Sequence, residues 1–104
     1  MVSVRLSSRD CPGHVEVALS GELDLVDASD VAVSLAAASS RGPLVIVDLS
    51  GLAFIDASGV AALARGRDCA RAGGGELRLS APQQQVRKML AIIFPDADFF
   101  TPGS

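Results

Sequence analysis

The chain has 104 residues, of which 49% are hydrophobic, so it is long and apolar enough to form one domain, over residues 1–104, around its own core. Its formal net charge of −3 and its nine scattered basic residues argue against nucleic acid as a partner, because phosphate binding needs clustered lysine and arginine. Two cysteines and one histidine form no zinc-binding pattern, and no apolar run approaches the ~20 residues that span a bilayer, which favours a cytoplasmic protein without metal, cofactor or membrane segment.

The first part of the chain has the pattern of a β-hairpin. Residues 2–8 and 15–19 alternate apolar with polar or charged side chains, as half-buried strands do. Between them, Cys11, Pro12 and Gly13 supply residues typical of a turn. We therefore predict two antiparallel strands.

The pattern then changes to that of a helix followed by a strand. Asp27 can cap a helix that Arg41, Gly42 and Pro43 end. The expected apolar side of this helix consists of Ala28, Val31, Ala32 and Leu35. Residues 44–49 are predominantly apolar, which predicts a strand buried on both faces in the middle of a sheet covered by helices.

A second helix is predicted to begin near Gly59. Its expected inward face contains Ala62, Leu63, Gly66, Cys69 and Ala70. Because Gly66 costs about 1 kcal/mol of helix propensity relative to alanine, close packing against the sheet is its expected purpose. The three glycines at 73–75 end the helix.

The last predicted elements are a strand over residues 76–80 and a helix with Pro82 in its first turn and Pro95 at its end. The expected buried stripe of this helix is Val86, Met89, Leu90 and Ile93. The order strand, strand, helix, strand, helix, strand, helix predicts an α/β fold, with a small mixed sheet of about four strands packed with about three to four helices. The strand-to-helix loops should then gather at one edge of the sheet.

Acidic residues occupy these strand-to-helix loops. Asp56 or Ser58 can serve as the N-cap of the second helix, which is an ordinary structural role. Glu22 and Asp24 follow an earlier strand, where they form either a solvated acidic turn or part of a binding surface. Asp48 ends the buried strand and is expected to bond to neighbouring loop amides.

Four short stretches together resemble the STAS domain, and most closely the bacterial anti-sigma factor antagonists. They are Leu19-Ser20-Gly21-Glu22-Leu23-Asp24, Asp48-Leu49-Ser50, Phe54-Ile55-Asp56 and Ser58-Gly59. The resemblance runs from Val15 to Leu79 and is looser over the last helix. It implies that Ser58 is phosphorylated by an anti-sigma factor that is also a serine kinase.

The same resemblance implies a cycle of partner switching. The unphosphorylated protein would bind the anti-sigma factor and free the sigma factor, the phosphorylated form would let go, and a PP2C-type phosphatase would restore the first state. The implied partner-binding residues are Glu22, Asp24, Asp56, Ala57, Ser58 and Gly59. Ala57 departs from the family, since many members carry a second serine there.

Two alternatives differ in class. A hydrolase would use Ser58 as nucleophile and His14 as base, but nothing in the sequence places these residues together and no Gly-x-Ser-x-Gly motif is present. We therefore predict that the protein is not an enzyme. STAS domains also occur in anion transporters, lipid-transport machines and stress-signalling assemblies, so the second alternative is a stand-alone STAS subunit that binds a protein partner without a phosphorylation switch.

Overall fold

The computed structural model describes residues 4–94 and 99–101. Within them the strands are β1 (Arg5–Cys11), β2 (His14–Leu23), β3 (Leu44–Ile55) and β4 (Glu76–Ser80). The helices are α1 (Leu25–Ser39), α2 (Ala57–Ala72) and α3 (Gln84–Ile93). The strands form one sheet in the order β1-β2-β3-β4, with β1 antiparallel to β2 and the other pairs parallel. The predicted α/β fold, its element order and the hairpin are confirmed.

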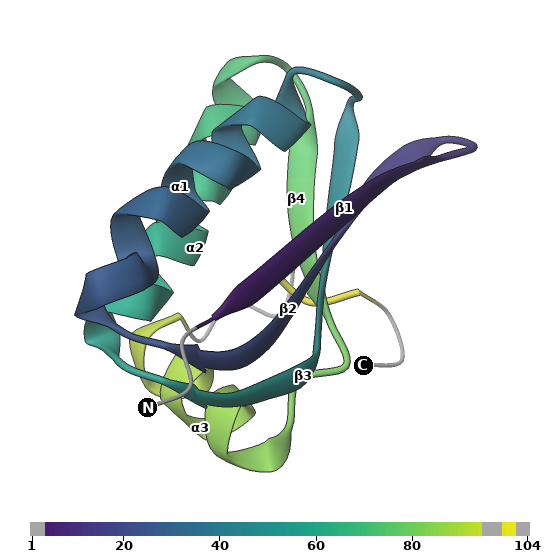
Figure 1. The fold of residues 1–104 in the computed structure, drawn as a ribbon. Helices are drawn as coiled ribbons and strands as arrows, with labels where there is room; N and C mark the ends of the chain where they lie inside the picture. Colours follow the sequence, from purple (N-terminus) through teal and green to yellow (C-terminus); the bar gives the residue numbers. More distant parts are fainter. Residues whose placement is uncertain (1–3, 95–98, 102–104) are drawn as a thin grey trace.

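Helices α1 and α2 lie side by side on one face of the sheet, and α3 lies beyond their lower ends beside β3 (Figure 1). The core fills the space between this helical layer and the sheet. Alternate strand residues face it, because successive side chains of a strand point to opposite faces. Those that are buried include Val15, Val17, Leu19, Val45, Val47, Leu49, Leu77 and Leu79.

The prediction that β3 is buried on both faces was wrong. The strand is central, between β2 and β4, but Leu44, Ile46 and Asp48 on its second face are only half-buried. The reason is that α1 and α2 cover only one face of the sheet (Figure 1). The edge strand β1 is more exposed than its alternating pattern predicts, with only Cys11 half-buried.

The starts of α1 and α3 and the exposure of one residue of α3 correct three predictions. Helix α1 is capped by Asp24, whose carboxylate accepts the Val26 amide at 3.0 Å, whereas Asp27 lies in the first turn and accepts the Val4 amide at 3.3 Å. Helix α3 is preceded by Gln83 as its N-cap residue, so Pro82 lies outside the first turn. Pro95, the expected stop, lies outside the described residues, and Ile93 is exposed instead of buried.

Helix α2 packs closely at Gly66, as predicted. A Cβ at this position would lie 2.8 Å from Leu35 Cδ1 of α1 and 3.3 Å from Leu77 Cδ1 of β4, so the close neighbour is α1 as well as the sheet. Cys69 is exposed, contrary to its expected place on the inward face. The buried position next to Gly66 belongs to Arg67, whose guanidinium carbon lies 4.6 Å from the centre of the Phe99 ring.

The chain returns to the outer edge of β4 near its end. The Thr101 amide donates to the Leu79 carbonyl at 2.9 Å, and Phe100 forms an isolated parallel bridge with Leu79. Phe99 is fully buried and meets Phe94 edge to face. No helix among the described residues is long and apolar enough to cross a membrane.

Candidate functional site

The carboxyl ends of β2 and β3 bring the acidic loops together. These neighbouring parallel strands end in register, with Glu22 opposite Phe54 and Leu23 opposite Ile55. Helix α1 begins two residues after β2, and α2 begins two residues after β3. Both helix N-termini therefore lie at the end of the sheet where these two strands finish (Figure 1). This topology places the loop with Glu22 and Asp24 beside the loop that leads to Ser58.

Asp56 joins the end of β3 to the start of α2. Its carboxylate Oδ1 accepts the Gly59 amide at 2.9 Å, its carbonyl accepts the Val60 amide at 3.0 Å, and its own amide donates to the Leu23 carbonyl at 3.2 Å. The residue therefore closes the strand pairing and satisfies an amide of the first helical turn. Of the two candidate N-caps left open by the sequence, Asp56 is the one that fills the role.

Gly59 permits the close approach of α2 to β2. A Cβ here would lie 2.7 Å from Ile55 Cγ1 and 2.8 Å from Leu23 Cγ, and only 3.0 Å from the Leu23 carbonyl oxygen. The two side-chain contacts are shorter than real Cβ atoms make and the third is unusually tight, so a larger residue would push the helix start away from the strand. Gly59 therefore has a packing role, which the sequence had assigned only to the partner surface.

Ser58 is the second residue of α2 and is half-buried, while Ala57 before it is exposed. Among the described residues, the Ser58 hydroxyl has no hydrogen-bond partner, and Asp56 provides the cap. The first-turn amides of a helix have no acceptors within the helix, and the helix dipole makes this end positive. The electrostatics of this helix end therefore favour an anionic group on the Ser58 oxygen.

The loop after β2 is shaped by an irregular stretch of strand. Gly21 has a φ of +89°, and the pairing of β2 with β3 shifts register on both sides of it. Beyond it, Glu22 is half-buried in the pairing with Phe54, and Asp24 caps α1. Asp24 is therefore more than a solvated turn residue.

Asp48 was expected to end its strand, but β3 continues to Ile55, so Asp48 lies within the strand and its carboxylate bonds to the strand itself. Its carboxylate accepts the Ser50 amide at 2.9 Å. Nearby, the Gln83 and Gln85 side-chain amides donate to the Ser50 and Ala53 carbonyls, each at 2.9 Å. These bonds attach the start of α3 to the segment of β3 that leads to the site.

Sequence reasoning missed three exposed apolar residues at this edge. Leu25 and Val26 are 74% and 75% exposed, and Phe54 is 47% exposed. The predicted helix start at Asp27 left Leu25 and Val26 in a loop, so their place on the first turn of α1 was not foreseen. An acidic residue one position before two apolar residues was the available signal for an earlier cap.

The structure separates the residues that a hydrolase would need. His14 pairs with Cys11 at the hairpin end of β2, whereas Ser58 follows the opposite end of the neighbouring β3. A strand of ten residues is roughly 30 Å long. Among the described residues no group of three or more His, Cys, Asp and Glu side chains is placed to hold a metal ion.

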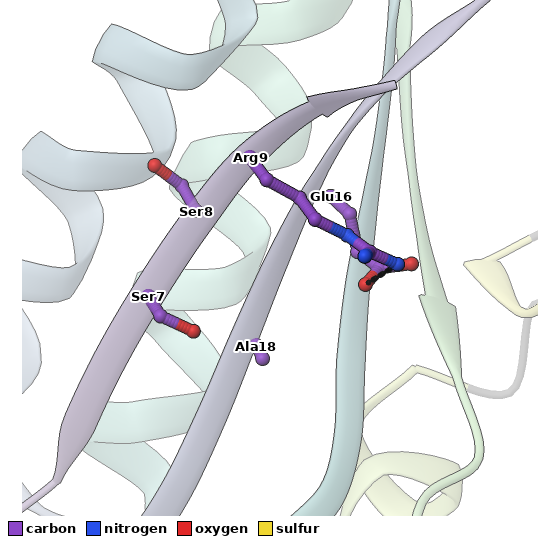
Figure 2. A pocket seen from close by; sticks show the side chains of 5 residues that line it. All are labelled: Ser7, Ser8, Arg9, Glu16 and Ala18. Atoms are coloured by element: carbon purple, nitrogen blue, oxygen red, sulfur yellow. Dashed lines mark ion pairs between the residues drawn. The ribbon is translucent and has the colours of Figure 1, made fainter. Parts of the chain in front are cut away.

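A pocket lies on the open face of the sheet, in the hairpin region (Figure 2). It is lined by Ser7, Ser8, Arg9, Glu16 and Ala18. Arg9 Nη2 and Glu16 Oε1 form an ion pair at 3.1 Å across the two strands. Both side chains are thereby engaged with each other, away from the strand ends that carry the candidate site.

The fold and the loop architecture define a STAS domain. A family model described as "Mlab, STAS domain" matches residues 7–94. The chain belongs to the STAS domain family. No curated protein matches the chain in sequence.

Solved structures share this fold at low identity. An anti-sigma factor antagonist from Mycobacterium paratuberculosis matches with a TM-score of 0.81 and 24% identity over 95% of this chain and 86% of its own. The Bacillus anti-sigma factor antagonist SpoIIAA in its unphosphorylated form gives 0.77 and 21%, over 93% and 86%, and its phosphorylated form has also been solved. The murine solute carrier 26 family member A9 anion transporter gives 0.71 and 22%, over 85% of this chain but 15% of the transporter.

Proposed function

We propose that this protein is an anti-sigma factor antagonist. In its unphosphorylated form it binds an anti-sigma factor that is also a serine kinase, and phosphorylation of Ser58 ends this binding. The observation that carries the proposal is the division of roles in the first turn of α2, where Asp56 caps the helix and leaves the Ser58 hydroxyl without a partner among the described residues. The structural similarity to antagonists known in phosphorylated and unphosphorylated forms supports it.

The fold should tolerate a phosphate on Ser58. Phosphorylation adds a charge of about −1.5 to −2, and the N-terminus of a helix stabilises an anion by roughly 0.3–1 kcal/mol. Asp56 is near and repels it, but in the free protein water and salt screen this repulsion. We therefore expect little change in the free energy of unfolding.

A partner that covers the loop changes this balance. Excluding water from the phosphate removes its hydration and strengthens its repulsion by Asp56, at a cost of several kcal/mol in a buried setting. Every ~1.4 kcal/mol lowers affinity tenfold. Binding should therefore be lost while the domain stays folded, and a PP2C-type phosphatase that removes the phosphate would restore binding.

The test compares wild type, Ser58→Ala and Ser58→Glu as baits in a lysate of the source cells, with captured proteins identified by mass spectrometry. Ala37→Glu is the control, since it adds the same charge at an exposed position near the other end of α1. We expect wild type, Ser58→Ala and Ala37→Glu to recover a serine kinase and Ser58→Glu to lose it. All four should melt within a few degrees of one another, and a large drop for Ser58→Glu would contradict the proposed switch.

A second candidate is a subunit of a transport complex. The match to one portion of an anion transporter and the family description "Mlab, STAS domain" favour it. In that case the domain would bind a transporter protein, and Ser58 would be only a residue of the first helical turn. Capture of transporter subunits by wild type and Ser58→Glu alike would support this candidate over the first.

A further inference from the structure

The end of the sheet that carries Ser58 also carries large apolar side chains that are exposed to solvent. Leu25, Val26 and Phe54, here called the apolar triad, are 74%, 75% and 47% exposed. Single apolar residues on a surface are ordinary. These three share one neighbourhood, since each lies within three residues of the last paired rung, Leu23 opposite Ile55.

The same rung limits how far the triad lies from Ser58. Ser58 is also three residues from it, and three residues of chain extend at most about 11 Å. A standard protein interface covers about 800 Å² on each partner, which is roughly 30 Å across. A partner that docks over Ser58 therefore has the triad within its reach.

Carboxylates border the triad. Glu22, Asp24 and Asp56 are each one residue from the rung, and no basic residue occurs within three residues of it on either segment, all of which the structure describes. Residues 20–64 contain six acidic residues and one basic residue, Arg41. Arg41 lies after the far end of α1, where it bonds Asp10 at 2.8 Å.

We propose that the apolar triad anchors the protein partner of this site, and that the partner matches it with apolar side chains flanked by basic ones opposite Glu22 and Asp24. This inference rests on the proposed function only for the identity of the partner. Apolar anchors supply most of the affinity in such interfaces, while complementary charges supply orientation and association rate. In this arrangement the basic groups lie opposite Glu22 and Asp24 and not opposite Ser58.

The triad is held in position before binding. The amide of Val26 is bonded to the Asp24 carboxylate at 3.0 Å in the first turn of α1, and Phe54 is paired with Glu22 in the sheet. Side chains presented on ordered backbone lose less freedom on association, which favours affinity. The fold therefore presents the anchor in a form ready for docking.

Helix α1 supplies a matched control. Val33 is 67% exposed on the same helix, seven residues and about 10 Å beyond Val26. The photo-crosslinking residue p-benzoylphenylalanine is placed at position 26 or 33 in the full chain, in source cells, and adducts are identified after irradiation. A docking site centred on the triad predicts strong adducts to one protein from position 26 and markedly weaker ones from position 33.

The captured protein is then purified and its affinity is measured with variants. We expect Leu25→Gln and Phe54→Thr to weaken binding tenfold or more and Val26→Thr about fivefold, whereas Val33→Thr stays within twofold. Glu22→Gln should reduce the salt dependence of the association rate. Circular dichroism melting of each variant separates loss of binding from loss of fold.

The outcomes distinguish this inference from the proposed function. If the protein captured from position 26 is not a serine kinase but shows this variant pattern, the docking site stands and the proposed function fails. Suppose instead that a serine kinase binds wild type. The inference is then overturned if adducts at position 26 are absent or no more abundant than at position 33, or if the triad variants bind with unchanged affinity. Absence of any adduct at position 26 overturns it as well.

Discussion

Gly59 at the start of α2 lies so close to Leu23 at the end of β2 that a Cβ on the glycine would approach the leucine Cγ to 2.8 Å. This contact joins the two loops of the candidate site. Together with the bond from the Asp56 amide to the Leu23 carbonyl at 3.2 Å, it sets the position of the first turn of α2 relative to the sheet.

Adding a methyl group at this contact should destabilise the domain. We expect Gly59→Ala to cost about 1–3 kcal/mol of unfolding free energy, because the nearest atoms are branched side-chain carbons and a backbone oxygen that cannot move freely. Denaturant unfolding measures the change. Gly73→Ala is the control, since its nearest atom is 3.6 Å away, and an equal loss there would show that the close contact is not the cause.

Removing the cap of α2 should destabilise it by a different route. We expect Asp56→Ala to cost about 0.5–2 kcal/mol, because the Gly59 amide loses its acceptor at 2.9 Å, and Asp56→Asn to cost less because the amide oxygen can still accept. Thermal unfolding provides the measurement. Asp30→Ala, at an exposed position of α1, should change stability by no more than about 0.5 kcal/mol.

Protonation of Glu76 should lower the free energy of unfolding at acidic pH. Burial by itself would raise the pKa of Glu76, but its bonds from the Arg71 side chain and the Leu77 amide, with the charges of Arg71 and Arg67, hold the pKa below its ordinary value of 4.5. A carboxyl with a lowered folded-state pKa stabilises the fold above its ordinary pKa and loses that effect as pH falls through the lowered one.

Unfolding measured from pH 6 downward therefore tests this cluster, and we expect Glu76→Gln to show a shallower loss of stability below pH 4.5 than wild type. Glu16→Gln, which removes the carboxyl paired with Arg9 on the open face, serves as the comparison. A wild-type slope retained by Glu76→Gln would assign the acid sensitivity to other groups.

The glutamines at the start of α3 should steady the strand that leads to Ser58. We expect Gln85→Ala, which removes the donor to the Ala53 carbonyl at 2.9 Å, to speed hydrogen exchange of amides in residues 50–58 with a stability loss of about 0.5–1.5 kcal/mol. Gln84→Ala at the exposed neighbouring position is the matched control. Equal exchange in the two variants would show that the bond does not constrain this segment.

Local patterns in the sequence were sufficient for the order of elements. The strand over residues 76–80 was predicted with the bounds that the structure has, because glycines and a proline flank an alternating run. The cap of α1 was misplaced by three residues, since Asp24 and Asp27 are both good caps and local propensity does not choose between them. The pairing of β2 with β3 makes the choice.

The misassigned side chains depend on contacts between distant segments. Arg67 is buried because the chain returns near Phe99 to cover it, and no pattern within α2 contains that information. In the candidate site, the prediction that the two acidic loops lie side by side is confirmed. The distance between these loops depends on the register of β2 and β3, and the exposure of Leu25 and Val26 depends on which residue caps α1.

The carboxylate of Asp56 holds the Gly59 amide, so the cap of α2 does not depend on the side chain at position 58. Had the hydroxyl at position 58 been the cap, its substitution by an apolar residue would have cost about 0.5–2 kcal/mol of stability. Under the proposed function, the side chain at position 58 can be phosphorylated repeatedly, or be replaced by threonine over evolutionary time, while the cap of α2 stays in place. Under the proposed function, specificity at this position can thus diverge without a matching loss of thermodynamic stability.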